Sequence, residues 1–179
     1  MGRYSLLPYN LSKLINSIEP SRDGEMLYFP CKVWLREGGT LDTVYVEPEK
    51  MYIDCWSIYP EDDNHKQSIL IDNVVDIQES PVRLPVRFAN QVYDAGESGM
   101  GVYVFTVLFA DGSKQAYRSG GAIDFVPYPT GKGAQDIVGV MPHEGRDNSS
   151  AKDCLSWYWC LYSGVEQEDA GQEDAERTE

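Results

Sequence analysis

The stretch GGAIDFVPYP, residues 120–129, gives the clearest indication of the fold, and TGKG at 130–133 links it to DIVGVMPHE at 136–144. An upstream segment, IDCWSIYP at 53–60, follows a similar order. In both segments an Ile-Asp pair precedes Tyr-Pro, and a polar loop then leads to an alternating apolar run typical of a strand. We therefore predict two related β units. The alternative is that β meanders share the same turns without any duplication.

Working outward, alternating and apolar runs predict further strands on both sides of this stretch. These runs cover 27–36, 41–47, 51–59, 68–72, 73–79, 102–109 and 114–118. Adjacent glycines at 38–39 and the Asp-Gly pair at 111–112 supply the positive φ values that hairpin turns need. The run at 102–109 is apolar on both faces, which predicts a central strand buried on both sides.

Helical periodicity is clearest near the N-terminus. Over 8–18 the apolar side chains form one stripe, and Pro8 suits a first helical turn. We expect this helix to cover one end of a sheet. The segment 86–94 is compatible with either a helix or a strand, and so is the aromatic-rich run at 154–162.

Together these elements predict a mainly β (α+β) fold. It consists of two small antiparallel meanders or partly open barrels, with an N-terminal helix and a disordered acidic C-terminal tail. The predicted units are 1–80, with the helix and the first β unit, 81–165, with the second, and 166–179, the tail. Packing of both β units into one compact domain is the alternative.

The charge balance limits the classes of partner. The chain has 15 basic and 29 acidic residues, a net charge of −14, and −8 remains on residues 1–165 when the tail is left out. This charge disfavours nucleic acid and anionic membranes. No leader pattern opens the chain and no run of eighteen apolar residues occurs, so we expect a cytoplasmic protein. Its four cysteines lack a C-x-x-C pair, and we expect buried, reduced thiols.

Familiar site motifs fail at definite positions. The GKG at 131–133 resembles a phosphate-binding loop, but Val126 replaces the upstream glycine and Gly133 the required Ser or Thr. Met100 replaces the last glycine of a nucleophile elbow at 96–100. Two histidines, His65 and His143, without a cysteine pair do not make a zinc pattern. The sequence therefore predicts no cofactor and no metal site.

Three side chains are candidates for acid-base chemistry. Asp54 and Asp124 each follow an isoleucine among apolar residues, and at matching places in two β units they could approach each other as paired carboxylates. His143 is the third candidate. The structural interpretation of the two aspartates, which we favour, is that they accept hydrogen bonds from turn amides or pair with arginine.

A dense polar set lies around the 136–144 strand. A loop beside a buried strand is where binding residues usually lie. We predict a binding surface there, made by Lys132, Asp136, His143, Glu144, Arg146 and Asp147.

The function that the sequence favours is that of an acidic protein-binding module without catalysis, such as an inhibitor or immunity-type protein of a basic protein partner. One alternative is a hydrolase or isomerase that uses Asp54, Asp124 or His143. Another is an assembly protein with 154–162 as its interface, because three large aromatic residues need burial or a partner. The sequence does not set the oligomeric state.

Overall fold

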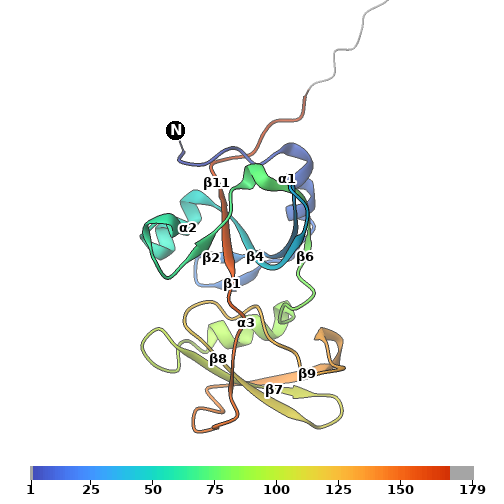
Figure 1. Cartoon of the computed structure of the whole chain (residues 1–179). Helices are drawn as coiled ribbons and strands as arrows, with labels where there is room; N and C mark the ends of the chain where they lie inside the picture. Colours follow the sequence, from blue (N-terminus) through green and yellow to red (C-terminus); the bar gives the residue numbers. More distant parts are fainter. Residues whose placement is uncertain (1, 170–179) are drawn as a thin grey trace, which may run out of the picture.

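The computed structural model describes residues 2–169 and has two lobes, one on a five-stranded and one on a four-stranded β-sheet, together with a separate two-stranded hairpin (Figure 1). Within these residues the strands are β1 (Ser21–Asp23), β2 (Met26–Tyr28), β3 (Pro30–Leu35), β4 (Thr40–Pro48), β5 (Gln67–Ser68), β6 (Val74–Glu79), β7 (Tyr103–Phe109), β8 (Lys114–Ser119), β9 (Ile137–Pro142), β10 (Lys152–Asp153) and β11 (Tyr158–Tyr162). The α-helices are α1 (Tyr9–Asn16), α2 (Glu49–Trp56) and α3 (Val86–Asp94). Short 3-10 helices are η1 (Pro60–Asp62), η2 (Ile71–Asn73) and η3 (Ala134–Asp136). The prediction of a mainly β fold with an N-terminal helix is confirmed.

The upper lobe in Figure 1 holds a five-stranded sheet in the order β5-β11-β4-β3-β6. Successive side chains of a strand point to opposite faces of the sheet. The second half of β4 is buried along consecutive residues, so both faces of the sheet are covered there. On β4, Val44 and Val46 enter a core shared with α1, whereas Tyr45 enters a second core that continues into the lower lobe. Trp159 of β11 also enters this second core, which we call the junction core.

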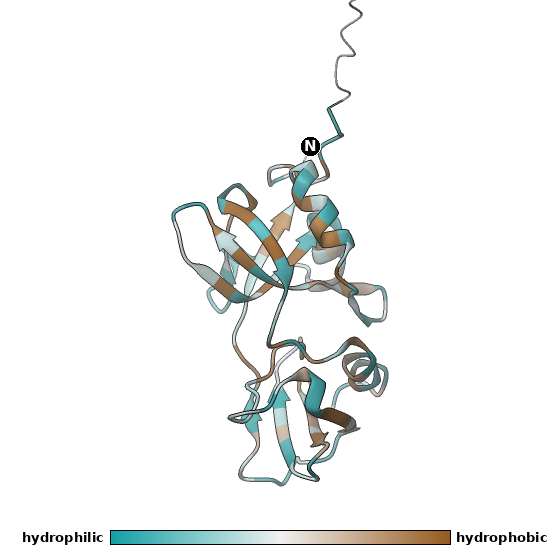
Figure 2. Cartoon of the chain, turned by 90° about the vertical axis from the view of Figure 1, so that its right-hand side faces the viewer, coloured by the Kyte–Doolittle hydropathy of each residue, from teal (hydrophilic) through white to brown (hydrophobic). Residues whose placement is uncertain are grey.

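The lower lobe holds the four-stranded sheet β10-β8-β7-β9. β7 lies between β8 and β9 and is buried along nearly its whole length, as its apolar sequence predicts. The ambiguous segment 86–94 is the helix α3, whose buried face includes Phe88, Ala89 and Val92. In Figure 2, apolar residues, coloured brown, occur along the strands of both lobes. The junction core thus joins the two sheets through α3.

The last strand returns to the upper lobe. β11 pairs in parallel with β4 and with β5, so the aromatic run at 154–162 completes the first sheet. Trp159 is 1% exposed, so the buried half of this run has no need of a partner. The second predicted unit, 81–165, therefore contains a strand of the first sheet. Residues 170–179 of the predicted acidic tail lie outside the described residues.

The predicted strand at 51–59 is wrong, because Glu49–Trp56 is the helix α2. Pro48 has the extended conformation of a residue that precedes a helix, and the Glu49 carboxylate stabilises the first turn. Tyr52 and Trp56, one helical turn apart, both pack on Trp159. Ser57, with φ of 65°, ends the helix in the left-handed conformation.

The helix also removes the support for an internal repeat. Ile53 and Asp54 lie in α2, whereas Ile123 and Asp124 lie outside any helix or strand, next to an isolated antiparallel bridge between Arg83 and Phe125. The two Ile-Asp pairs therefore have different local structures. Gly121, upstream of the second pair, has φ of +120°, and a Cβ there would lie 2.8 Å from the Trp56 ring. That glycine lets the loop pack against α2.

Candidate functional site

The six residues of the predicted binding surface lie at the two ends of β9. Lys132 forms an ion pair with Asp111, and the Asp136 carboxylate accepts the Gly133 N–H at 2.8 Å, both before the strand begins. His143 and the three other residues follow its end. A strand of this length separates its ends by about 20 Å. The structure does not bring the six side chains together, and their joint binding role stays a prediction.

His143 stabilises the loop that follows α3. Its Nε2 lies 3.0 Å from the Ala95 carbonyl oxygen, and its Nδ1 lies 2.8 Å from the Ser98 hydroxyl oxygen. Because a carbonyl only accepts, the ring donates to Ala95 from Nε2, while the Ser98 hydroxyl lies within hydrogen-bond distance of both Nδ1 and the Val104 carbonyl oxygen. Both nitrogens are therefore engaged. Glu144, Arg146 and Asp147 are exposed beside this loop.

The three acid-base candidates lie in different surroundings. Asp54 is exposed on α2 and forms an ion pair of 2.6 Å with Lys50. Asp124 is 0% exposed. Within the described residues, Asp54, Asp124 and His143 share no hydrogen-bond partner. The expected pairing of two carboxylates in one active site is not observed.

Asp124 lies at the junction of the lobes, where its carboxylate accepts three hydroxyl hydrogen bonds. Ser21 of β1 donates to Oδ1, and Tyr45 of β4 and Tyr93 of α3 donate to Oδ2 at 2.8 and 2.7 Å. The same tyrosine hydroxyls accept backbone N–H groups, of Asp124 at 3.3 Å and of Ile123 at 3.0 Å. We call this arrangement the Asp124 hub. It joins both lobes through hydroxyl donors, where the sequence suggested turn amides or a direct pair with arginine.

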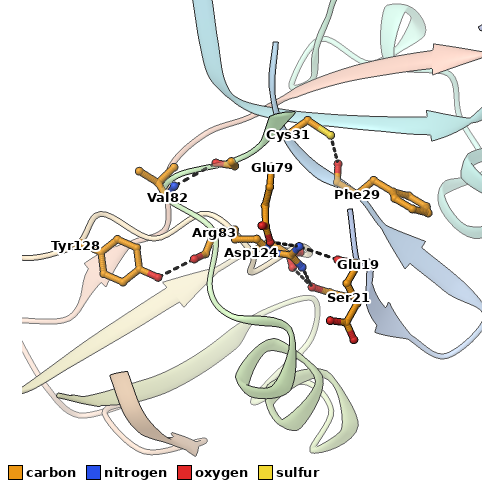
Figure 3. A network of polar contacts seen from close by, with 10 residues as sticks. Glu19, Ser21, Phe29, Cys31, Glu79, Val82, Arg83, Asp124 and Tyr128 are labelled. Atoms are coloured by element: carbon orange, nitrogen blue, oxygen red, sulfur yellow. Dashed lines mark hydrogen bonds and ion pairs between the residues drawn. The ribbon is translucent and has the colours of Figure 1, made fainter. Parts of the chain in front are cut away.

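Arg83 extends the hub through Ser21 (Figure 3). Its Nη2 donates to the Ser21 hydroxyl at 3.0 Å, and its Nη1 donates to the Glu19 carbonyl at 2.7 Å and to Glu79 at 2.9 Å. The Tyr128 hydroxyl donates to the Arg83 carbonyl at 2.7 Å. A buried cation thus balances the charge of a buried carboxylate, as burial of either alone would be costly.

Among the described residues, the carboxyl groups of Asp124 and Glu47 are fully buried, and burial raises the pKa of both. For Asp124, hydrogen bonds from Ser21 and Tyr93 and the charge of Arg83 oppose that rise in pKa. For Glu47, also 0% exposed, burial raises the pKa well above its ordinary value, and the Phe29 N–H at 2.7 Å opposes it. The second oxygen of Glu47 has no partner. Both carboxyl groups are enclosed in the core and are not accessible to a ligand.

A pocket of about 680 Å³ lies between the β1–β2 hairpin and α2. The eight lining residues are Asp23, Glu25, Met26, Pro48, Lys50, Met51, Asp54 and Cys55. Three of them carry carboxylates, and Lys50 is the only base among the eight. Met26, which is 2% exposed, contributes a thioether together with Met51. The pocket combines an apolar, sulfur-rich lining with an acidic one.

The surroundings of Asp23 are negative. Burial raises the pKa of its carboxyl group, and the nearby charges of Glu97, Asp124 and Asp94 raise it further. The Tyr103 hydroxyl, 3.3 Å away, opposes the rise in pKa. A cation bound beside Asp23 would stabilise the ionised form, since opposite charges favour ionisation.

The pocket also corrects one expectation about the cysteines. All four are free thiols, and Cys31 and Cys160 are buried as expected, but Cys55 is exposed on α2 at the pocket. Burial and the charges of Asp23 and Glu47 raise the pKa of Cys55. The raised pKa favours the neutral thiol over the thiolate, so Cys55 adds an uncharged sulfur group to the lining.

Four of the eight lining residues lie on α2, which the sequence patterns predict as a strand. The spacing of Met51, Tyr52, Cys55 and Trp56 already fits a helix with two faces, one packed and one open. The acids of the β1–β2 turn also appear in the sequence, but no pattern places that turn beside α2.

Within the described residues, no set of three or more His, Cys, Asp or Glu side chains is arranged to hold a metal ion. None of the described helices has both the length and the apolar character needed to cross a membrane. Comparison of the chain with protein-family models, curated proteins and solved structures finds no match.

Proposed function

We propose that the chain is an acidic binding module for a basic protein partner, and that the pocket between the β1–β2 hairpin and α2 receives a lysine or arginine side chain. The arrangement of three carboxylates around a thioether lining carries the proposal. Lysine and arginine have long apolar stems and a charged end, so such a side chain can contact both parts of the lining. An uncharged or acidic side chain satisfies only one of them.

Lys50 does not neutralise the pocket. Its ammonium lies 2.6 Å from Asp54, and both side chains are largely exposed, at 86% and 63%. Exposed pairs of this kind contribute little to stability. A cation of the partner can therefore replace Lys50 beside the Asp54 carboxylate at a small cost in free energy. Asp23 and Glu25 have no basic neighbour among the lining residues.

The charge of the whole body supports the same class of partner. With −8 on residues 1–165, long-range attraction speeds the encounter with a basic protein, and salt screens that attraction. Catalysis receives less support. Asp124 is enclosed by hydroxyl donors, and the ring nitrogens of His143 are occupied, so neither is poised to move a substrate proton.

The test uses acetylated hexa-lysine and hexa-arginine peptides in calorimetric titrations, with hexa-glutamine as the neutral control. The double variant Glu25→Gln/Asp54→Asn should bind the basic peptides about tenfold more weakly than the wild type, equal to about 1.4 kcal/mol. Binding by the wild type should also weaken when NaCl rises from about 50 to about 300 mM.

The matched control is Glu144→Gln/Asp147→Asn, which removes the same charge from the loop after β9. This control should keep nearly the wild-type affinity if the pocket is the site. Equal losses in both double variants would show that only the bulk charge matters. A loss confined to the control would move the site to the loop.

A further inference from the structure

The lower sheet ends in a strand that pairs on one side only. In the order β10-β8-β7-β9, the one neighbour of β9 among the described residues is β7. The edge strands β5 and β10 are two residues long, and the edge strand β6 carries Asp76 and Glu79 and contacts α1. β9 has six residues, IVGVMP, none of which is charged. It therefore lacks the charges that commonly keep an open strand from pairing with another chain.

The hydrogen-bond pattern shows which backbone groups of β9 face the open side. The His143 N–H donates to the Val104 carbonyl oxygen at 2.7 Å. In an antiparallel pair, hydrogen-bonded residues alternate with residues whose N–H and C=O point away from the neighbouring strand. In the register of β7 and β9, Gly139 and Met141 are therefore bonded to β7. The N–H and C=O of Val140, between them, point to the open side.

Further observations agree with an open edge. Pro142 lies two residues after Val140 and so has its orientation, and an edge strand accepts a proline where the missing N–H faces solvent. A register shift beside Leu108 leaves Val138 without an opposite residue on β7, and the Val138 side chain is 55% exposed. A Cβ at Gly139 would meet no atom of another segment within 4 Å. Among residues 2–169, no turn or loop hydrogen bond between backbone groups involves Val138 or Val140.

The charges at the two ends of β9 favour one kind of added strand. Asp136 lies before β9, Glu144 and Asp147 lie after it, and none of the three forms an ion pair within the described part of the chain. The bases beside them are Arg146 and Lys132, and Lys132 is already in an ion pair. A second copy would bring like charges together, with −14 on each chain. A strand with basic ends would meet opposite charge.

We propose that β9 binds an extended segment of a partner protein as a fifth strand of the lower sheet. The segment has alternating apolar side chains and a lysine or arginine near each end. Its backbone pairs with the N–H and C=O of Val140 and with the Pro142 carbonyl, and its apolar side chains contact Val138 and Met141. The edge shares no residue with the acidic pocket, so this proposal does not rest on the proposed function.

The test adds the peptide acetyl-KTVTVTK-amide and follows hydrogen exchange of the protein's backbone amides by NMR. In the free protein the Val140 amide should exchange rapidly, whereas those of Gly139 and Met141 should be protected by β7. At saturation with the peptide, exchange of Val140 should slow by about tenfold or more, and that of Gly139 and Met141 should change little. A peptide that does not bind, or that binds without protecting Val140, would overturn the proposal.

Two substitutions at one position separate backbone pairing from side-chain contact. Val140→Pro removes the outward N–H and leaves the bonds of Gly139 and Met141 to β7, so peptide binding should weaken by about tenfold or more. Val140→Ala keeps the N–H, and its affinity should stay within about threefold of the wild type. Urea midpoints establish that both variants fold. Equal affinity of the two variants would contradict pairing through the edge.

Three controls separate the edge from other sites and occupants. Acetyl-ETVTVTE-amide should bind at least about tenfold more weakly than the basic peptide, and equal affinity would contradict the selection by charge. Glu25→Gln/Asp54→Asn should leave peptide binding unchanged, whereas a loss would place the peptide in the acidic pocket. Sedimentation of the protein alone tests a second copy. A dimer that Val140→Pro abolishes would assign the edge to self-association and overturn the proposal.

Discussion

The Asp124 hub and the pocket beside α2 use the same kind of side chain in opposite ways. Asp124 is 0% exposed, and three hydroxyl groups donate to its two oxygens. In the pocket, Glu25 and Asp54 are exposed, and the lining offers them only the single charge of Lys50. The difference lies in the donors supplied by the fold itself. Where those donors surround a carboxylate, it stabilises structure, and where they are missing, its charge remains available to a partner.

Removing Asp124 tests the structural half of this comparison and should have the largest effect. Asp124→Ala leaves Ser21, Tyr45 and Tyr93 as buried hydroxyl groups without their acceptor. Since each unsatisfied buried group costs about 1–3 kcal/mol, the free energy of unfolding should fall by about 3 kcal/mol or more. Urea denaturation followed by tryptophan fluorescence measures the change.

Asp54→Ala is the control for that experiment. It removes an exposed carboxylate with one ion pair, and the free energy of unfolding should change by about 0.5 kcal/mol or less. Comparable losses in the two variants would contradict the distinction between hub and pocket.

The pH dependence of stability sharpens the comparison with a smaller effect. A carboxyl group whose pKa is raised on folding stabilises the fold fully below its unfolded pKa, and this contribution is lost as pH rises through the folded pKa. Burial raises the pKa of Glu47 in this way. Glu47→Gln should therefore gain stability relative to the wild type as pH rises.

Urea midpoints of both proteins from about pH 4 to about pH 8 measure this difference. The exposed pair offers the control, because the difference between Asp54→Asn and the wild type should vary much less with pH over the same range. A difference between Glu47→Gln and the wild type that stayed constant, or moved in the opposite direction, would show that Glu47 is not held in its neutral form.

The sequence predicted those parts of the fold that depend on local patterns. The glycines of the two hairpins, the apolar stripe of α1 and the doubly apolar run of β7 all depend on neighbouring residues, and these elements are confirmed. The parallel return of β11 depends on contacts between residues over a hundred positions apart. No local pattern encodes such a pairing, so the sequence of 154–162 is compatible with either a strand or a helix.

The candidate site divides in the same way. Asp124 is conspicuous in the sequence as an acid among apolar residues, but its donors are the hydroxyls of Ser21, Tyr45 and Tyr93 and not the turn amides or direct arginine pair that the sequence suggests. Its partners Tyr45 and Tyr93 lie on β4 and α3, far from Asp124 in the sequence, so no local pattern identifies them. The pocket was missed through one wrong element, since a strand at 51–59 points Met51 and Asp54 differently from the helix α2.

The most direct test of the proposed pocket follows the methyl groups of methionine by NMR while hexa-lysine is added. Met26 and Met51 line the pocket, whereas Met141 lies at the end of β9 and Met100, 98% exposed, reports contacts at the open surface. The methyl signals of Met26 and Met51 should shift with saturation, and those of Met100 and Met141 should stay in place. Shifts of Met141 with Met26 and Met51 unchanged would contradict the pocket and place the basic partner on the loop after β9.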